Sequence, residues 1–362
     1  MTMIVNDVKL DFSDVLFVPQ RSTWNTPQNR SAVNLERSFR FKHATGVGTW
    51  TTIPIIAANM DVVGTFEMAD ALGSYKMMTA LHKFYSEEQL VQFFERGRDY
   101  AFYSMGISDE EWKKFARVQQ QMTRQGTPLR FVCIDVANGY TEKFVDYIKR
   151  TRDTIGADTI IMAGNVVSPE MTIEVLRAGA DIVKVGIGSG SVCTTRKVAG
   201  VGYPQFSAVL ECANAAHGQG GHICSDGGIV QIADFAKAFG AGADFVMAGG
   251  MFAGHKECDG ELIYNDQSFN VNDGRVATHM AFRGMSSREA MIDHYGEKAS
   301  YRAAEGKQVL VPYKGPVAGT VEEILGGIRS TCTYIGARKL KDVPKCAQFI
   351  RVNRTHNTTF GE

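Results

Sequence analysis

The sequence predicts an α/β protein of the (β/α)8 TIM-barrel class, in which eight parallel strands alternate with helices. Short runs rich in β-branched residues alternate with longer amphipathic runs, which indicates repeated βαβ units. Eight such short runs are present, the number that closes a barrel. No G-x-G-x-x-G fingerprint follows the first run, as an open dinucleotide-binding sheet would require. The strands are expected at Ile53–Asn59, Met77–His82, Tyr100–Met105, Arg130–Val136, Thr159–Ala163, Ile182–Val185, Gly221–Ser225 and Asp244–Ala248.

Apolar residues between these runs recur at helical spacing, three or four positions apart. A weak internal repeat supports the same architecture. Arg177–Val183 resembles Gly240–Val246, and each segment reads as a helix end, a glycine turn and a buried strand. The expected helical faces include Leu90–Phe94, Trp112–Val118, Phe144–Ile148, Met171–Leu176, Val209–Ala216 and Ile232–Phe239.

The pattern changes after the eighth strand. His255–Gly315 is polar and irregular, and it is too long for a simple turn, which favours a flap over the active site. A helical pattern resumes at Thr320–Leu325 and begins a C-terminal helix and tail over residues 320–362. We therefore expect residues 1–362 to form a single barrel domain with an inserted flap.

Composition restricts the partners of this barrel. The chain has 362 residues, of which 44% are hydrophobic and 22% are charged, as in globular proteins. Lys plus Arg and Asp plus Glu both total 39, so no overall positive field attracts nucleic acid or an anionic membrane. The N-terminus lacks the pattern of a signal peptide, and no apolar run reaches the roughly 18 residues of a membrane span.

The cysteines indicate a reducing compartment. The chain has seven, an odd number, with no C-x-x-C pair and no histidine at zinc spacing. Free thiols in the cytoplasm therefore fit better than a disulfide framework.

Cys193 is the first candidate for chemistry. It lies in the glycine-rich run Gly188–Arg196, directly after the sixth expected strand, where active-site loops of barrels lie. Glycines allow a ligand to approach the backbone closely, and the charge of Arg196 would favour a thiolate. A free cysteine is more often a small buried hydrophobe, but this polar setting favours the functional interpretation.

Polar residues and glycines follow nearly every other expected strand. Some of these polar residues are explained as helix N-caps. Two glycine pairs on the last two strand ends, Gly227-Gly228 and Gly249-Gly250, indicate a backbone cradle for phosphate. The polar residues at these ends include Asn59, Asp61, His82, Lys83, Asp135, Asn138, Asn165 and Asp226.

Several of these motifs resemble those of the IMP dehydrogenase/GMP reductase family. The resemblance runs from about Asp7 to about Arg351. It rests on Ala57–Asp61, Asp135–Tyr140, Ile182–His217, Ser225–Gly228 and Val311–Gly315.

Three features resemble the reductase branch rather than the dehydrogenase branch. One helix alone separates the second and third strands, where dehydrogenases usually insert CBS domains. Arg302–Lys307 is similar to the reductase form of the flap, and the Arg-Tyr pair that dehydrogenases use to activate water is not evident. Ser330–Tyr334 also resembles the reductase sequence.

The resemblance implies NADPH-dependent reductive deamination of GMP to IMP and ammonia, with a homotetrameric assembly. Cys193 would form a thioimidate at C2 of the purine, and Thr195 with Glu305 would deliver a proton to the departing amine. The open alternatives are an IMP dehydrogenase, which converts IMP and NAD to XMP, and a nucleotide-binding barrel without catalysis.

The resemblance also implies ligand contacts, position by position. Ser189 stands where the family usually has proline, which bears on a potassium site at this loop, and Tyr264–Phe282 departs from the usual flap. The implied substrate contacts are Ser191, Asp226, Gly227, Gly228, Gly249, Gly250, Met285, Ser286, Arg302 and Gly306. The implied cofactor contacts are Lys83, Asp135, Val136, Ala137, Ile187, Gly188 and Tyr301, with Ser330, Thr331, Cys332 and Thr333 of a neighbouring subunit. The implied potassium site comprises Gly188, Gly190, Cys193 and Arg196.

Overall fold

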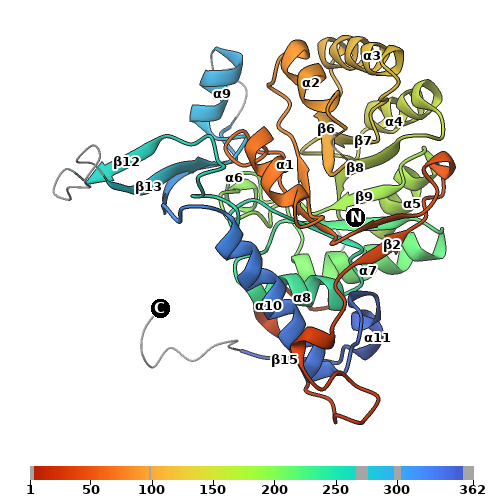
Figure 1. Ribbon diagram of the computed structural model, residues 1–362, viewed down its shortest axis with the longest axis vertical. Coiled ribbons are helices and arrows are strands. Elements are labelled where there is room, and N and C mark those ends of the chain that lie inside the picture. The colour runs from red at the N-terminus through yellow and green to blue at the C-terminus, as the bar shows by residue number, and fades with distance from the viewer. Residues whose placement is uncertain (1–3, 98, 266–275, 297–302, 354–362) are drawn as a thin grey trace.

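A computed structural model of the chain describes residues 4–97, 99–265, 276–296 and 303–353. Its centre is a closed barrel of parallel strands in the order β4-β5-β6-β7-β8-β9-β10-β11, with β11 paired back to β4 (Figure 1). The (β/α)8 fold class expected from the sequence is therefore confirmed. The barrel strands are β4 (Ile55–Ala57), β5 (Met78–Ala80), β6 (Ala101–Met105), β7 (Phe131–Asp135), β8 (Ile160–Val166), β9 (Ile182–Val185), β10 (His222–Asp226) and β11 (Phe245–Ala248).

Helices follow the strands around the outside of the barrel. Each helical face expected from the sequence lies in a helix of the structure, because its apolar side packs onto the strands. The helix after β4 was not expected, although Thr65 caps it by accepting a hydrogen bond from the Met68 N–H. The outer helices are α1 (Phe66–Gly73), α2 (Glu87–Phe94), α3 (Asp109–Arg124), α4 (Glu142–Ile155), α5 (Pro169–Arg177), α7 (Gln205–Gly218) and α8 (Ile232–Gly240), with the short α6 (Thr195–Val198) after β9.

Successive side chains of each strand divide between two apolar clusters. In β4, Ile55 and Ala57 pack outward against the helices, whereas Ile56 packs into the barrel interior. A hairpin of β2 (Arg37–Phe39) and β3 (Trp50–Thr52) contributes Phe39 and Trp50 to the interior cluster. No sequence pattern predicts this hairpin, because each strand has only three residues.

The internal repeat has a physical role at the starts of β9 and β11. The buried Asp181 carboxylate accepts the Ile161 N–H of the neighbouring strand at 3.1 Å, and Asp244 accepts the Ile223 N–H at the same distance. Arg152 pairs with Asp181 at 2.6 Å, and Arg37 pairs with Asp244 at 2.9 Å. The repeated aspartate therefore joins adjacent strands at the end of the barrel opposite the candidate site.

The segment after β11 has more regular structure than the sequence indicated. A three-stranded antiparallel sheet is formed by β12 (Leu262–Asn265), β13 (Val276–Arg283) and β14 (Gln308–Pro312). Helix α9 (Arg288–Tyr295) follows β13, and Figure 1 shows β12 and β13 extending away from the barrel beneath it. We call residues 255–315 the flap; of these, 266–275 and 297–302 lie outside the described residues.

The chain ends on the outside of the barrel. Helix α10 (Ala318–Ile335) packs along α8, and β15 (Phe349–Arg351) pairs with β1 (Val15–Phe17). The short α11 (Val343–Cys346) lies between them in sequence. Among the described residues, every helix is too short or too polar to cross a bilayer.

Replacing Asp244 should test the role of the repeated aspartate. We expect Asp244→Asn to lower the free energy of unfolding by about 3–5 kcal/mol, because Arg37 then becomes a buried charge without its partner. Burial opposes ionisation of Asp244, but His217, His222 and Arg37 hold its pKa well below the usual value.

A lowered pKa stabilises the fold above about pH 4 and loses that contribution as the pH falls. The difference between wild type and variant should therefore shrink in acid, which urea unfolding at neutral pH and at about pH 3 would measure. The exposed Asp146→Asn is the control and should change stability by no more than about 0.5 kcal/mol. An Asp244→Asn protein as stable as the control would contradict this role.

Candidate active site

The carboxyl ends of the barrel strands surround a cavity of about 690 Å³. Its walls come from loops after most of the barrel strands and from the flap, as expected for a barrel of this class. Most residues that the sequence analysis selected line it. They are Lys83, Asp135, Val136, Ala137, Ile187, Gly188, Gly190, Ser191, Cys193, Thr195, Asp226, Gly227, Gly228, Gly249, Gly250, Met285, Ser286, Glu305 and Gly306.

Cys193 lies on the loop between β9 and α6. Its Sγ is 3.2 Å from Oγ1 of Thr195, so the thiol donates to a hydroxyl that begins α6. The loop closes on itself through a hydrogen bond from the Cys193 N–H to the Gly190 carbonyl, 3.1 Å long. The thiol is half-buried and faces the cavity, so a ligand can reach it.

Backbone hydrogen bonds attach the flap to the Cys193 loop. The Thr194 N–H donates to the Glu305 carbonyl at 2.8 Å, and the Lys307 N–H donates to the Val192 carbonyl at 3.0 Å. Together they form a short antiparallel bridge between Cys193 and Gly306. The flap backbone thus places the half-buried Glu305 at the edge of the same cavity, although no hydrogen bond joins its carboxylate to Thr195 among the described residues.

A buried ammonium group lies at the centre of the cavity floor. The Lys184 side chain is 4% exposed, and its Nζ lies 2.6 Å from Asp135 Oδ1 and 2.7 Å from Asp226 Oδ2. Asn59 donates to Asp135 at 3.0 Å, and Asn165 donates to Asp226 at 2.9 Å. Burial alone would lower the pKa of Lys184, but the two carboxylates raise it well above the ordinary value.

The glycines of the expected phosphate cradle lie where a Cβ would press on neighbouring side chains. Gly227 has φ +88°, and a Cβ there would lie 2.5 Å from Ser189 Oγ. A Cβ on Gly249 would lie 2.6 Å from Met60 Sδ, and one on Gly250 would lie 2.9 Å from Ser191 Oγ. These glycines therefore keep backbone exposed to the cavity, as an anion cradle requires.

Lys83 lies on the opposite rim and is held by Glu111 of α3 at 2.8 Å. Burial would lower the pKa of Lys83, but the Glu111 carboxylate raises it above the usual value. The same carboxylate accepts the N–H groups of Gly106 and Ser108, which fixes the start of α3. A charged, positioned lysine at this rim suits the phosphate or ribose of a cofactor.

The charge of Arg196 is directed away from the thiol, contrary to the prediction from its position in the sequence. Its guanidinium binds the Asp11 carboxylate at 3.0 Å and the Tyr203 carbonyl at 2.8 Å, so its charge is compensated away from Cys193. Only its carbonyl remains relevant to the expected cation site. The carbonyls of Gly188, Cys193 and Arg196 accept no hydrogen bond from the described residues, which fits oxygen ligation of a hard cation.

Several selected residues lie elsewhere. Tyr301 and Arg302 fall outside the described residues. Ser330, Thr331, Cys332 and Thr333 are on α10, away from the cavity lining, and Cys332 is fully buried. Within this chain they do not meet the Cys193 loop.

The sequence places Asn59 and Asn165 at strand ends without indicating a role for them, and it indicates no role for Lys184. The available signal was the placement of Lys184 within an otherwise apolar strand, Ile182–Val185. A lysine there must be buried, and a buried ammonium needs carboxylate partners. Those partners lie on β7 and β10, which sequence spacing alone does not bring together.

The closed barrel and its cavity define a (β/α)8-barrel enzyme with an accessible cysteine on the loop after the sixth barrel strand. Residues 9–359 match the model of the IMP dehydrogenase / GMP reductase domain, and the chain belongs to that family.

Relatives that match this chain over nearly their full length are members of the same family. The chain is 51% identical over 365 residues to a GMP reductase of Caenorhabditis elegans, covering 99% of this chain and 96% of the relative. It is 52% identical over 362 residues to a GMP reductase of Klebsiella pneumoniae subsp. pneumoniae, covering 99% of both chains. A GMP reductase of Phytophthora infestans is 51% identical over 364 residues, covering 100% of this chain and 95% of the relative.

Lys184→Met should show how far the cavity floor depends on one charge. We expect a loss of up to about 3 kcal/mol in the free energy of unfolding at neutral pH, because two half-buried carboxylates lose the cation that they share.

The pKa of Asp135 lies below its usual value in the folded protein, as the Lys184 charge outweighs the effect of burial. Its contribution to stability is therefore present above about pH 4 and lost below it, so the deficit of Lys184→Met should narrow in acid. Urea unfolding at neutral pH and at about pH 3 measures both values. The exposed Lys113→Met serves as the control. A Lys184→Met deficit no larger than that of Lys113→Met would refute the interpretation.

Proposed function

We propose that this enzyme catalyses the NADPH-dependent reductive deamination of GMP to IMP and ammonia. The observation that carries the proposal is the junction of Cys193, Thr195 and the flap residue Glu305 at one edge of the cavity. Full-length relatives at about 51% identity named GMP reductase support the same activity. We also propose that the enzyme is located in the cytoplasm and that its ligands are GMP and IMP.

In this mechanism the Cys193 thiolate attacks C2 of guanine and forms a carbon–sulfur bond. Thr195 accepts the thiol hydrogen bond at 3.2 Å, so its hydroxyl would pass the thiol proton on to the Glu305 carboxylate, which then holds the proton for the departing amine. The 2-amino group departs as ammonia with a proton relayed through Thr195 from Glu305, leaving a thioimidate on Cys193. The flap backbone, bonded to the loop on both sides of Cys193, limits access of water to this intermediate.

The cofactor side of the cavity would be formed by Lys83, Asp135, Val136 and Ala137, with Ile187 and Gly188 at its base. NADPH, when bound, supplies the hydride that reduces C2 and releases the Cys193 thiolate. Asp135 is held in place by Lys184 and Asn59, so its carboxylate is oriented before a ligand arrives. We further propose that the enzyme is a homotetramer. In it, Tyr301 and residues Ser330–Thr333 of a neighbouring subunit would contact the cofactor.

The nucleotide would bind across the glycine cradle. Asp226 has a fixed carboxylate that suits the paired hydroxyls of ribose, and Ser191, Gly227, Gly249 and Gly250 leave room for phosphate. Met285, Ser286, Arg302 and Gly306 would complete the site from the flap, and Gly228 would lie behind the cradle.

A potassium ion would be held by the carbonyls of Gly188, Gly190, Cys193 and Arg196. Potassium bound there would brace the loop that carries the thiol. Ser189 replaces the usual proline, but its hydroxyl donates to the Asp226 carbonyl at 3.1 Å and restrains the loop by another route.

Product analysis tests the reaction. Incubation with GMP and NADPH should yield IMP and ammonia in equal amounts, and Cys193→Ala should lower kcat on the order of 10⁴-fold or more. Cys346→Ala, a half-buried thiol remote from the cavity, is the matched control and should keep full activity. XMP formed from IMP and NAD, with no IMP formed from GMP, would establish the dehydrogenase alternative instead. Absence of both reactions would favour a binding protein.

The role of Glu305 has a separate test. Glu305→Gln should lower kcat roughly 10²- to 10⁴-fold with little change in KM for GMP, because the amide cannot supply the proton. Glu289→Gln, an exposed change on α9, should leave kcat unaltered. A Glu305→Gln enzyme that retains the kcat of wild type would remove Glu305 from the proton path.

A further inference from the structure

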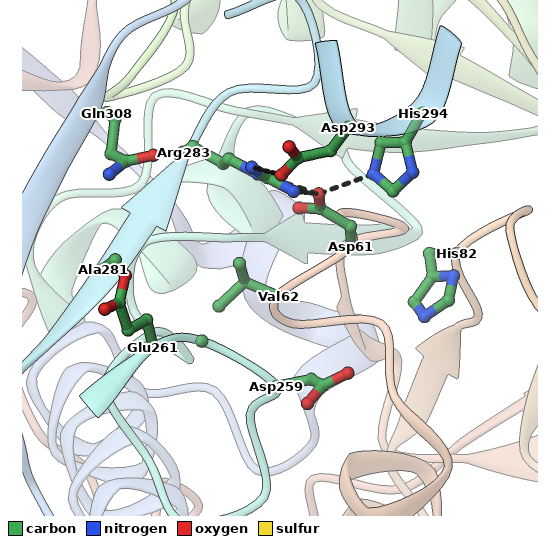
Figure 2. A pocket seen from close by; sticks show the side chains of 11 residues that line it. Asp61, Val62, His82, Asp259, Glu261, Ala281, Arg283, Asp293, His294 and Gln308 are labelled. Atoms are coloured by element: carbon green, nitrogen blue, oxygen red, sulfur yellow. Dashed lines mark hydrogen bonds and ion pairs between the residues drawn. The ribbon is translucent and has the colours of Figure 1, made fainter. Parts of the chain in front are cut away.

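A second cavity of about 330 Å³ lies between the flap and the barrel rim (Figure 2). Its barrel wall comes from the loops after β4 and β5, and its flap wall comes from β13, β14, α9 and the segment before β12. The residues that line it are Asp61, Val62, His82, Asp259, Gly260, Glu261, Ala281, Arg283, Asp293, His294 and Gln308.

The two oxygens of the Asp61 carboxylate differ sharply. The side chain is 8% exposed, and Oδ2 accepts hydrogen bonds from Arg283 Nε at 2.9 Å, Arg283 Nη2 at 2.7 Å and His294 Nε2 at 2.8 Å. Oδ1 is buried and has no hydrogen-bond partner among the described residues. Figure 2 shows this oxygen on the side of the carboxyl group away from the dashed bonds. A buried acceptor left unpaired is costly unless a bound ligand or a water molecule supplies a donor.

The charges around the cavity favour a cation. Arg283 is shared between Asp61 and Asp293, so its positive charge is already compensated. Asp259 and Glu261, which Figure 2 places across the opening from Asp61, form no ion pair with the described residues. Burial lowers the pKa of His82 to about 4, which leaves its imidazole neutral near pH 7. The cavity is therefore left with an excess of negative charge.

The volume of the cavity and the polar side chains that line it restrict the class of ligand that it can bind. Among the described residues, no group of three or more His, Cys, Asp and Glu side chains has the arrangement of a metal site. A volume of about 330 Å³ exceeds what a single ion needs and lies at the lower end of pockets for small organic ligands. A ligand with N–H donors would satisfy Asp61 Oδ1, and its charge would balance Asp259 and Glu261.

We propose that this cavity binds a small organic ammonium ion, with one ammonium group donating to Asp61 and the body of the ligand lying between Asp259 and Glu261. The proposal is independent of the reaction assigned to the Cys193 cavity. The two cavities are nevertheless neighbours: Met285 lines the first one, and its sulfur lies 3.2 Å from the Asp61 backbone nitrogen. The new cavity also bridges the flap and the barrel, so its ligand would contact both.

Calorimetric titration of the full chain with 1,4-diaminobutane tests the proposal without any nucleotide. We expect saturable binding at constant ionic strength, and a dissociation constant raised at least about tenfold in Asp61→Asn. Because Asp61 also holds the flap through Arg283, the double variant Asp259→Asn/Glu261→Gln provides a second test on exposed side chains, with the same tenfold loss expected. Glu170→Gln on α5 is the control and should bind like wild type.

Four results would overturn the proposal. The first is no saturable heat with the diamine, and the second is equal affinity in wild type and in the double variant. The third is equal affinity for tetramethylammonium, which has the charge but no N–H donor. The fourth is equal affinity for ammonium chloride, which lacks the organic body. Because neither GMP nor NADPH is present, failure here leaves the proposed reaction untouched, and failure of that reaction leaves this site untouched.

Discussion

The cavity depends above all on one buried charge, the ammonium of Lys184. A lysine enclosed by barrel strands has lost its hydration and is stable only if carboxylates replace the water. Asp135 on β7 and Asp226 on β10 supply them at 2.6 and 2.7 Å. Their remaining oxygens and lone pairs recruit Asn59 and Asn165, so strand ends that are far apart in sequence are tied to one centre. The two carboxylates proposed to meet cofactor and substrate are thereby oriented in advance.

The flap is attached to this preorganised floor in two different ways. Near Cys193 the attachment is made by main-chain hydrogen bonds, with Thr194 and Lys307 as donors. Farther out it is made by side chains, where Asp61 binds Arg283 and His294 and the His294 ring stacks on Phe84 at 3.5 Å between centroids. The first attachment sets the geometry at the thiol. The second holds α9 against the loop that carries Lys83.

The sequence was enough to predict the barrel because apolar periodicity is a local property. Each of the eight expected strands overlaps a barrel strand of the structure, and their ends differ by no more than about three residues. The cavity glycines and Cys193 were also predictable, since strand ends of a barrel converge on one face. The β2–β3 hairpin was missed because its strands are too short to show a period. Its proximity in sequence predicts that Arg196 favours the Cys193 thiolate. In the structure its guanidinium instead binds the carboxylate of Asp11, which is far away in the chain. The role of Lys184 could not be predicted because its partners are set by tertiary contact.

The junction at Cys193 explains how one barrel can host more than one reaction. Main-chain hydrogen bonds fix Glu305 and Lys307 whatever their side chains are, so residue 305 can change without unseating the flap. Gly306 has no such freedom, because a Cβ there would lie 2.8 Å from the Ser287 nitrogen. In the proposed mechanism, the thiol and its glycine cradle belong to the barrel and would serve any reaction at C2 of the purine. The side chain at position 305 is presented separately, and a carboxylic acid in that place suits a leaving group that must be protonated. If the proposed mechanism holds, the choice between expelling ammonia and admitting water depends on a flap segment that can vary while the barrel stays constant.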